Sequence, residues 1–159
     1  MISYDLMYPG DIFNMGSVNI DYLTENYTPG YYFHYIFNYP NEIYSIKRGN
    51  KVLGYLIGKN EEKDGRTGHV TAISIAQSIR KFGFGSKLMD FYENEEEGRC
   101  ASFIDLFVRK SNKKAIDFYS KRNYVVNEII ENYYSNPVED AYDMRKYFND
   151  EEQNIGNVD

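Results

Sequence analysis

Two glycines and two basic side chains lie together in residues 80–85, where a helix is expected to begin. The first turn of a helix leaves backbone N–H groups unpaired and carries a partial positive charge, so phosphate groups bind there. Gly83 and Gly85 allow positive φ angles and close approach of a ligand, and Arg80 and Lys81 add positive charge. An ordinary turn is the alternative, because short glycine motifs often occur without a ligand. Taken alone, these residues leave a phosphate-binding loop and a simple turn open.

A histidine and a threonine alternate along a predicted strand at residues 67–76. Because strand side chains point to opposite faces in turn, His69, Thr71, Ile73 and Ile75 share one face. An imidazole beside a hydroxyl can hydrogen-bond a polar ligand. A single histidine in a strand is more often a structural residue, and the pattern by itself favours that interpretation.

A tyrosine on a predicted helix is a third candidate. Tyr119 follows Ala115 and Ile116 at spacings of four and three, which places the three on one helix face. This spacing alone is typical of a core aromatic residue. The chain has 17 tyrosines, and their number does not separate core packing from hydroxyls that line a pocket.

Length and charge exclude several classes of protein. The 159 residues fit one domain with a single core. A net charge of −6 argues against a general nucleic-acid surface, which needs clustered Lys and Arg. No apolar run approaches the ~18 residues of a membrane helix, and the first residues do not resemble a signal peptide. We therefore expect neither direct nucleic-acid binding nor a membrane.

Metal ligands and cysteines are scarce. His34, His69 and Cys100 lack ligand spacing, so we expect no metal site. The single cysteine cannot form an internal disulfide and suits a reducing, intracellular setting. A cytoplasmic location is the resulting expectation.

The elements that must position these residues alternate between strand-like and helix-like segments, which favours an α/β fold. A hairpin is expected over residues 42–60, with its turn at Gly49. Helices are expected over residues 11–19, with Asp11 as a possible N-cap, and over residues 28–40. The other expected elements are strands at 2–6, 67–76, 102–110, 124–130 and 140–148, and helices at 83–97 and 111–123.

Acidic residues are expected in solvent at two places. Glu95, Glu96 and Glu97 end a predicted helix, where the helix dipole disfavours them, so we expect a solvated and frayed end. Residues 148–159 are polar and acidic and are predicted to form a disordered tail after a single domain of residues 1–147.

The order of strand, glycine loop, helix, strand and helix resembles the GCN5-related N-acetyltransferase superfamily. Its acetyl-coenzyme A loop reads Arg/Gln-x-x-Gly-x-Gly/Ala, which matches Arg80 to Gly85. A later helix in that superfamily often reads Asn-x-x-Ala-x-x-Phe/Leu-Tyr-x-x-x-Gly-Phe/Tyr, which matches Asn112 to Tyr119. Asn123 stands where the pattern has glycine. Asparagine is the next best residue for a left-handed helix end, so the departure is expected to be harmless.

Five further segments resemble the catalytic subunits of N-terminal acetyltransferase B, a family within this superfamily. The resemblance spans about residues 1–147, and its last segment is long and unusual, which makes it specific. The segments are DYLTENY at 21–27, GHVTAISI at 68–75, FIDLFVRKSN at 103–112, NYYS at 132–135 and EDAYDMRK at 139–146.

The resemblance implies a twisted, mixed sheet of about seven strands flanked by helices. Two central strands, here near residues 66–75 and 103–109, would splay apart to admit acetyl-coenzyme A as co-substrate. Its pantetheine arm would pair with the first of them like an added strand. The cofactor contacts implied are Ile73, Ile75, Arg80, Lys81, Phe82, Gly83, Phe84, Gly85, Ser86, Asn112 and Tyr119.

The implied reaction transfers acetyl from a thioester to the N-terminal Met of proteins that begin Met-Asp, Met-Glu, Met-Asn or Met-Gln. An α-amino group has a pKa of roughly 7.7–8.0, so a strong general base is not needed. Tyr119 matches the family's donor to the leaving sulfur. Glu25 would bind the cationic amine or help to remove its proton, and both roles stay open. Tyr133 is the third catalytic candidate.

The resemblance also implies a groove for the substrate peptide. Tyr133 and Tyr134 would line it, with a strand-end aromatic pair as the alternative. Glu25 and Tyr27 would build its other wall. Leu23, together with Tyr22, is a guess for the methionine pocket.

The second side chain of the substrate would be recognised by His69, with Thr71 as helper. Asp, Glu, Asn and Gln all offer an oxygen acceptor, and His69 would serve as the donor, protonated or neutral.

The implied partners are a nascent polypeptide N-terminus and a large helical-repeat auxiliary subunit that docks on the ribosome. The predicted helices at 11–19 and 30–39 are candidates for contact with that subunit. The second is more aromatic than one buried face needs, although ordinary packing on the sheet is the alternative. Two other functions stay open: an acetyltransferase for other N-termini, lysine or small amines, and a coenzyme A-binding subunit without turnover.

Overall fold

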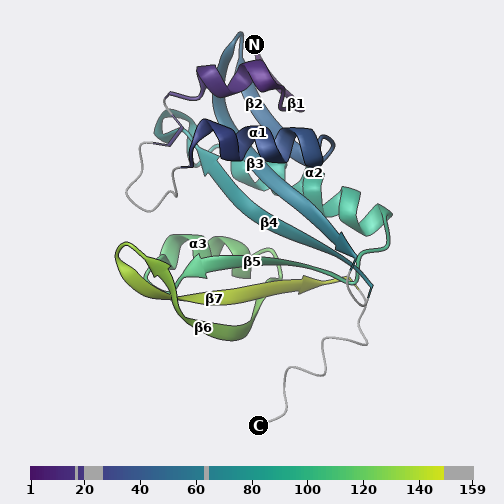
Figure 1. Cartoon of the computed structure of the whole chain (residues 1–159), viewed down its shortest axis with the longest axis vertical. Helices are drawn as coiled ribbons and strands as arrows, with labels where there is room; N and C mark the ends of the chain where they lie inside the picture. The colour runs from purple at the N-terminus through teal and green to yellow at the C-terminus, as the bar shows by residue number, and fades with distance from the viewer. Residues whose placement is uncertain (17, 20–26, 63–64, 149–159) are drawn as a thin grey trace. The chain divides into compact units, whose positions relative to one another are not determined.

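Seven strands and three α-helices make up the chain in the computed structural model, which describes residues 1–16, 18–19, 27–62 and 65–148. The strands are hydrogen-bonded in the order β1-β2-β3-β4-β5-β7-β6. They form a mixed α/β fold, which confirms the predicted class (Figure 1). The expected splay of the two central strands stays a prediction.

The chain divides into two compact units. Unit 1 comprises Met1–Asn60 and Val70–Glu95, and unit 2 comprises Glu61–His69 and Glu96–Asp159. Strand β4 (Arg66–Ile75) therefore contributes its first residues to unit 2 and the rest to unit 1.

Unit 1 begins with antiparallel strands. β1 (Ile2–Leu6) pairs with β2 (Ile43–Arg48), and β2 pairs with β3 (Lys51–Glu62). The turn between β2 and β3 has Gly49 at φ 59°, a left-handed conformation that glycine adopts without steric cost. The predicted hairpin is thus confirmed.

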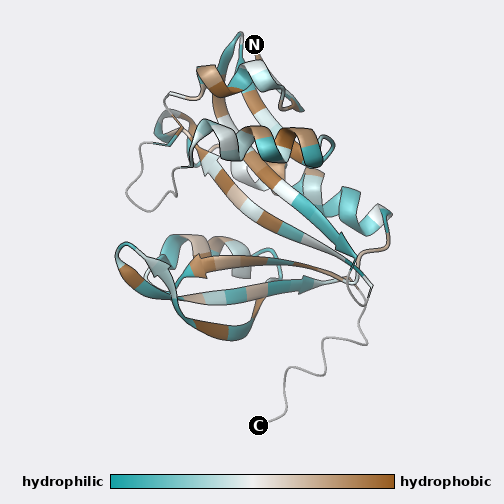
Figure 2. Ribbon diagram, viewed as in Figure 1, coloured by the Kyte–Doolittle hydropathy of each residue, from teal (hydrophilic) through white to brown (hydrophobic). Residues whose placement is uncertain are grey.

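Two helices cover opposite faces of these strands. α1 (Pro29–Asn38) buries Tyr32 and Ile36 in a cluster with Ile43 of β2. α2 (Phe84–Gly98) instead contacts the next residue of β2, because the Phe91 ring stacks on Tyr44 with centroids 6.1 Å apart. Brown and pale segments alternate along β4 in Figure 2, as expected for a strand whose faces differ.

The first predicted helix is shorter and tighter than expected. Residues 11–19 do not form one helix; the structure has a 3₁₀ helix, η1 (Pro9–Asn14), instead. Asp11 is not its N-cap but its third residue, and its carboxylate accepts a 2.7 Å hydrogen bond from the Tyr8 backbone N–H. Asp11 also pairs with Lys47 Nζ at 2.6 Å, which the local pattern did not indicate.

The acidic end of α2 is the second correction. Glu96 is fully buried, so the expectation of a solvated run of glutamates is wrong for this residue. Its Oε1 accepts from Arg99 Nη1 at 3.1 Å, and this charged partner three residues away makes the burial possible. Glu95 and Glu97 on either side are exposed, as expected.

Unit 2 is built on β5 (Phe103–Arg109), which pairs antiparallel with β7 (Val138–Tyr147). β6 (Val125–Ser135) pairs with the other edge of β7. Alternate residues of β5 are buried, namely Ile104, Leu106 and Val108. β6 extends five residues beyond the predicted strand, so it includes NYYS.

Helix α3 (Lys113–Ser120) is shorter than the predicted helix at 111–123, and the two asparagines expected to mark its ends, Asn112 and Asn123, flank it. The Asn112 side chain caps the helix by accepting from the Ala115 N–H at 3.2 Å. Asn123 adopts φ 69°, the left-handed conformation expected where the family pattern has glycine.

The domain boundary is not tested by this structure. Residues 149–159, the predicted tail, lie outside the described residues. Among the residues described, no helix is both long and apolar enough to span a bilayer.

Candidate functional site

The glycine loop lies in unit 1 between β4 and α2. A short 3₁₀ helix, η2 (Gln77–Ile79), follows β4, and α2 begins at Phe84. Lys81 and Gly83 both have positive φ angles, of 68° and 80°. A Cβ added at Gly83 would meet no atom within 4 Å, so the glycine is required by its backbone conformation and not by crowding.

The start of α2 has the features of an anion-binding site. The Lys87 N–H donates to the Gly83 carbonyl at 3.0 Å. The N–H groups of Phe84, Gly85 and Ser86 come before this bond, and such groups of a first helical turn have no partner within the helix. The residues therefore fit a bound pyrophosphate group.

Arg80 has a structural role in this loop. Its Nε–H donates to the Ile75 carbonyl at 2.8 Å, which ties the loop to the end of β4. Lys81 and Phe82 are exposed. The Ile75 side chain packs over β3, because a Cβ added at Gly54 would lie 2.7 Å from its Cδ1. Ile73 is half-buried on the same strand.

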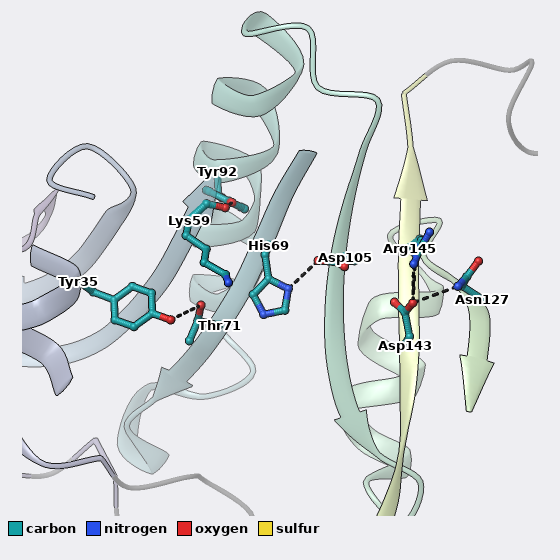
Figure 3. Close-up of polar contacts among 9 residues, drawn as sticks. All are labelled: Tyr35, Lys59, His69, Thr71, Tyr92, Asp105, Asn127, Asp143 and Arg145. Atoms are coloured by element: carbon teal, nitrogen blue, oxygen red, sulfur yellow. Dashed lines mark hydrogen bonds and ion pairs between the residues drawn. The ribbon is translucent and has the colours of Figure 1, made fainter. Parts of the chain in front are cut away.

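A row of tyrosine hydroxyls reaches Thr71 in unit 1. The Tyr27 ring stacks on Tyr31 with centroids 4.1 Å apart. The Tyr31 hydroxyl lies 3.4 Å from that of Tyr35. The Thr71 hydroxyl lies 3.4 Å from the same Tyr35 oxygen (Figure 3). Burial is the main cause that raises the pKa of Tyr31, so its hydroxyl stays protonated at neutral pH. Sequence reasoning found Tyr27 and Thr71 but missed Tyr31 and Tyr35, although residues 27, 31 and 35 recur at helical spacing.

His69 has an acidic partner in unit 2. Its Nδ1 lies 2.6 Å from Asp105 Oδ1, with 17% and 21% of the two side chains exposed (Figure 3). Asp105 was missed. The only sequence signal is a carboxylate in the middle of the apolar strand FIDLFVR, and its partner is 36 residues away.

Aromatic rings continue from His69 along the same face of unit 2. The Phe107 ring lies 5.3 Å from the imidazole, and the Tyr133 ring lies 5.0 Å from Phe107. Tyr134 is edge-on to Tyr133 at 5.0 Å. The structure therefore brings His69 together with the predicted pair Tyr133 and Tyr134, and Tyr133 is 48% exposed.

Tyr119 is buried on α3 in unit 2, against Phe118 and Tyr124. Within the described part of the chain its hydroxyl makes no hydrogen bond, and burial alone raises its pKa. The hydroxyl oxygen is not among the fully enclosed polar atoms that lack a partner, so a ligand atom can reach it and accept its hydrogen bond.

Leu23, Glu25 and Tyr22 lie outside the described residues. The predictions for the methionine pocket and for the amine-binding carboxylate are therefore not tested. The expected lack of a metal also stays a prediction.

A family model matches most of the chain. The model of the acetyltransferase (GNAT) family matches residues 13–124. N-alpha-acetyltransferase 20 of Dictyostelium discoideum is 42% identical over 139 residues, which cover 86% of this chain and 80% of that protein.

Two solved structures resemble the whole fold. The crystal structure of Chaetomium thermophilum Naa20 in complex with a bisubstrate analogue superposes with a TM-score of 0.86 at 32% identity, covering 91% of this chain and 86% of that one. The NatB acetyltransferase complex bound to CoA and MES gives a TM-score of 0.83 at 30% identity, covering 92% and 99%.

Proposed function

The chain belongs to the acetyltransferase (GNAT) family, and from this premise we propose that it is the catalytic subunit of an N-terminal acetyltransferase of the B type. It transfers acetyl from acetyl-coenzyme A to the N-terminal Met of proteins whose second residue is Asp, Glu, Asn or Gln. The observation that carries the proposal is the similarity to N-alpha-acetyltransferase 20, which extends over 86% of the chain.

The glycine loop holds the coenzyme A pyrophosphate in this proposal. The amides of Phe84, Gly85 and Ser86 donate to its oxygens, and the partial charge of α2 favours the anion. Lys81 adds positive charge from the exposed side of the loop. The co-substrate supplies an acetyl group on a thioester, and the chain's own residues orient it.

Tyr119 donates a hydrogen bond to the sulfur as the thiolate leaves. A thiol pKa of roughly 8.5, as for cysteine, makes the thiolate only weakly basic, so a hydrogen bond suffices. The raised pKa of Tyr119 keeps its proton in place at neutral pH, so the hydroxyl acts as a donor.

The amine loses its proton with little assistance. Its pKa of roughly 7.7–8.0 leaves a useful neutral fraction at pH 7. We propose that Glu25 or a water molecule near Tyr133 accepts the proton. The exposure of Tyr133, at 48% of the residue, supports this role, because water reaches this side chain.

The second residue of the substrate is recognised by His69 and Thr71. They share one face of β4, and each already has a hydrogen-bond partner that orients it. Tyr133 and Tyr134 contact the substrate peptide in this proposal, and Tyr27 is a separate peptide contact.

An auxiliary subunit docks on the aromatic surface of η1 and α1 in unit 1. Phe13 and Phe37 are 77% and 69% exposed, and Phe33 lies between them, 6.2 Å from each ring. An exposed aromatic patch of this kind is typical of an interaction site. Replacing Phe13 and Phe37 by Ser should abolish copurification of the auxiliary subunit and leave coenzyme A binding intact; unchanged copurification would contradict the assignment. We propose that this subunit is of the helical-repeat type, docks on the ribosome, and places the enzyme in the cytoplasm.

A peptide panel tests the proposed function. Acetyl transfer should be measured to peptides that begin Met-Asp, Met-Glu, Met-Asn, Met-Leu and Ser-Glu, with and without the auxiliary subunit. Selective acetylation of the first three is expected. Transfer to none of them, with coenzyme A bound and the partner present, would overturn the proposal in favour of another acceptor or a binding role.

A further inference from the structure

The His69–Asp105 pair is held too closely to leave the imidazole free to rotate. Nδ1 and Oδ1 are 2.6 Å apart, the length of a strong, charge-assisted hydrogen bond. The imidazole also packs edge-to-face against Phe107, with an interplanar angle of 62°. Asp105 and Phe107, which contact the imidazole, both belong to β5, so this one strand fixes both the position and the plane of the ring.

The partner decides which nitrogen carries the proton. An ionised carboxylate only accepts hydrogen bonds, so His69 Nδ1 must donate to Asp105. In the neutral ring, Nε2 is then an acceptor. Nε2 becomes a donor only when the ring carries its second proton. The neutral donor considered from the sequence is therefore disfavoured by Asp105.

Asp143, a second carboxylate on this face, has hydrogen-bond partners of its own, and burial and then the charge of nearby Asp105 raise its pKa. Asp143 Oδ2 accepts from Arg145 Nη2 at 2.8 Å and from Asn127 Nδ2 at 3.0 Å (Figure 3). Its β7 position is opposite Phe107 and not opposite Asp105. Asp143 thus provides a matched carboxylate that does not bind His69 in this structure.

We propose that Asp105 is a positioning residue that keeps a proton on His69 Nδ1 and thereby makes Nε2 recognise acidic and amide second residues in two different states. This inference rests on the proposed function. A substrate Asp or Glu carboxylate binds the doubly protonated ring, which donates from Nε2. A substrate Asn or Gln donates its amide N–H to the bare Nε2 of the neutral ring. An apolar second residue can do neither.

The first experiment observes the proton directly in the wild-type chain. Imidazole ¹⁵N chemical shifts distinguish a protonated from a bare ring nitrogen. The chain has two histidines. In the variant His34→Gln, which changes an exposed residue of α1, His69 is the only source of an imidazole signal. A neutral ring protonated at Nδ1 is expected. A neutral ring protonated at Nε2 would overturn the proposal, and this test needs no substitution at Asp105.

The second experiment measures substrate discrimination in Asp105→Asn. The asparagine amide can donate to Nδ1, which moves the proton of the neutral ring to Nε2. The charge-assisted bond to a substrate carboxylate is then replaced by a weaker one. We expect kcat/KM for a Met-Asp peptide to fall about fivefold to tenfold more than that for its Met-Asn twin, chiefly through KM.

Asp143→Asn is the control for a change of charge alone, because its carboxylate interacts electrostatically with Asp105 but is not the partner of His69 Nδ1. It should leave the Met-Asp to Met-Asn ratio unchanged. An equal loss for both peptides in Asp105→Asn, or the same change of ratio in Asp143→Asn, would show a merely structural or long-range effect and overturn the proposal.

The experiments can refute the proposed function and the role of Asp105 separately. If the wild-type chain, with its auxiliary subunit, acetylates neither peptide, the proposed function fails while the ¹⁵N signal still reports on Asp105 and His69. If acetylation is selective but Nε2 carries the proton of the neutral ring, only the role of Asp105 fails.

Discussion

The Arg109 guanidinium lies 4.0 Å from the centre of the Tyr134 ring and is almost fully buried beneath it. The same guanidinium donates to the carbonyls of Pro137 and Asn136, at 3.1 and 3.2 Å. The Tyr134 hydroxyl in turn donates to the Phe107 carbonyl at 3.3 Å. Arg109 thus connects the predicted peptide-binding tyrosine to the β6–β7 turn.

Arg109→Lys should therefore weaken both the fold and the peptide site. Lysine cannot reproduce a planar group that stacks on a ring and donates to two carbonyls. We expect a loss of about 1–3 kcal/mol in the free energy of unfolding by urea and a raised KM for the peptide. Arg122→Lys is the control, since Arg122 lies farther from its ring, 5.9 Å from Phe118. Equal effects of the two substitutions would contradict the role of Arg109.

Glu139 makes the stability of the β6–β7 turn depend on pH. Hydrogen bonds from the hydroxyl and then the backbone N–H of Ser111 lower the pKa of Glu139 below its usual 4.5. The folded state therefore favours the ionised carboxylate, so this stabilisation is present above pH 4.5 and is lost as the pH falls through the lowered pKa.

Glu139→Gln should remove that dependence. Between pH 6 and pH 3 the wild type is expected to lose more unfolding free energy than the variant, as measured by urea unfolding at both values. All other titrating groups cancel in the comparison. Equal losses would show that Glu139 does not stabilise the turn through its charge.

Gly83→Ala should weaken acetyl-coenzyme A binding. Alanine at φ 80° costs about 1–2 kcal/mol, and relief of that strain would displace the amides of the first turn of α2. We expect KM for acetyl-coenzyme A to rise about tenfold. Gly98→Ala, at the other end of α2 with no atom within 4 Å of the added Cβ, should change nothing. If both variants keep the wild-type KM, the loop is an ordinary turn.

Tyr119→Phe should slow turnover without loosening the cofactor. Loss of a hydrogen bond to a charged atom costs about 1.5–3 kcal/mol, or roughly 10- to 100-fold in kcat. Coenzyme A affinity, measured by calorimetry, should stay within about twofold. Tyr124→Phe, in contact with the same ring, should keep kcat. A wild-type kcat in Tyr119→Phe would mean that Tyr119 is only a core residue.

The elements were predictable wherever the local pattern decides the structure. The β2–β3 hairpin follows from its apolar strands and Gly49, and α3 follows from Asn112 and Asn123. β6 was predicted too short, because Glu131 and Asn132 interrupt its apolar run, whereas its end is set by pairing with β7 from Ser135 to Val138.

The residues of the candidate site likewise fall into those that a local motif predicts and those that only the fold brings together. Gly83 and Tyr119 could be predicted because their motifs lie within a few residues. Asp105 could not, since only the fold brings it to His69, which is 36 residues away in the sequence. Partners of buried charges are set by tertiary structure more than by local sequence.

Locating the acetyl group on a product tests the central claim most directly. A peptide that begins Met-Asp and carries an internal lysine should be incubated with the chain, its auxiliary subunit and acetyl-coenzyme A, beside a Met-Leu twin. Fragment mass spectra are expected to place one acetyl on the α-amine of the Met-Asp peptide and to leave its lysine and the twin unmodified. Acetyl on lysine, or equal modification of both N-termini, would contradict an N-terminal acetyltransferase of the B type.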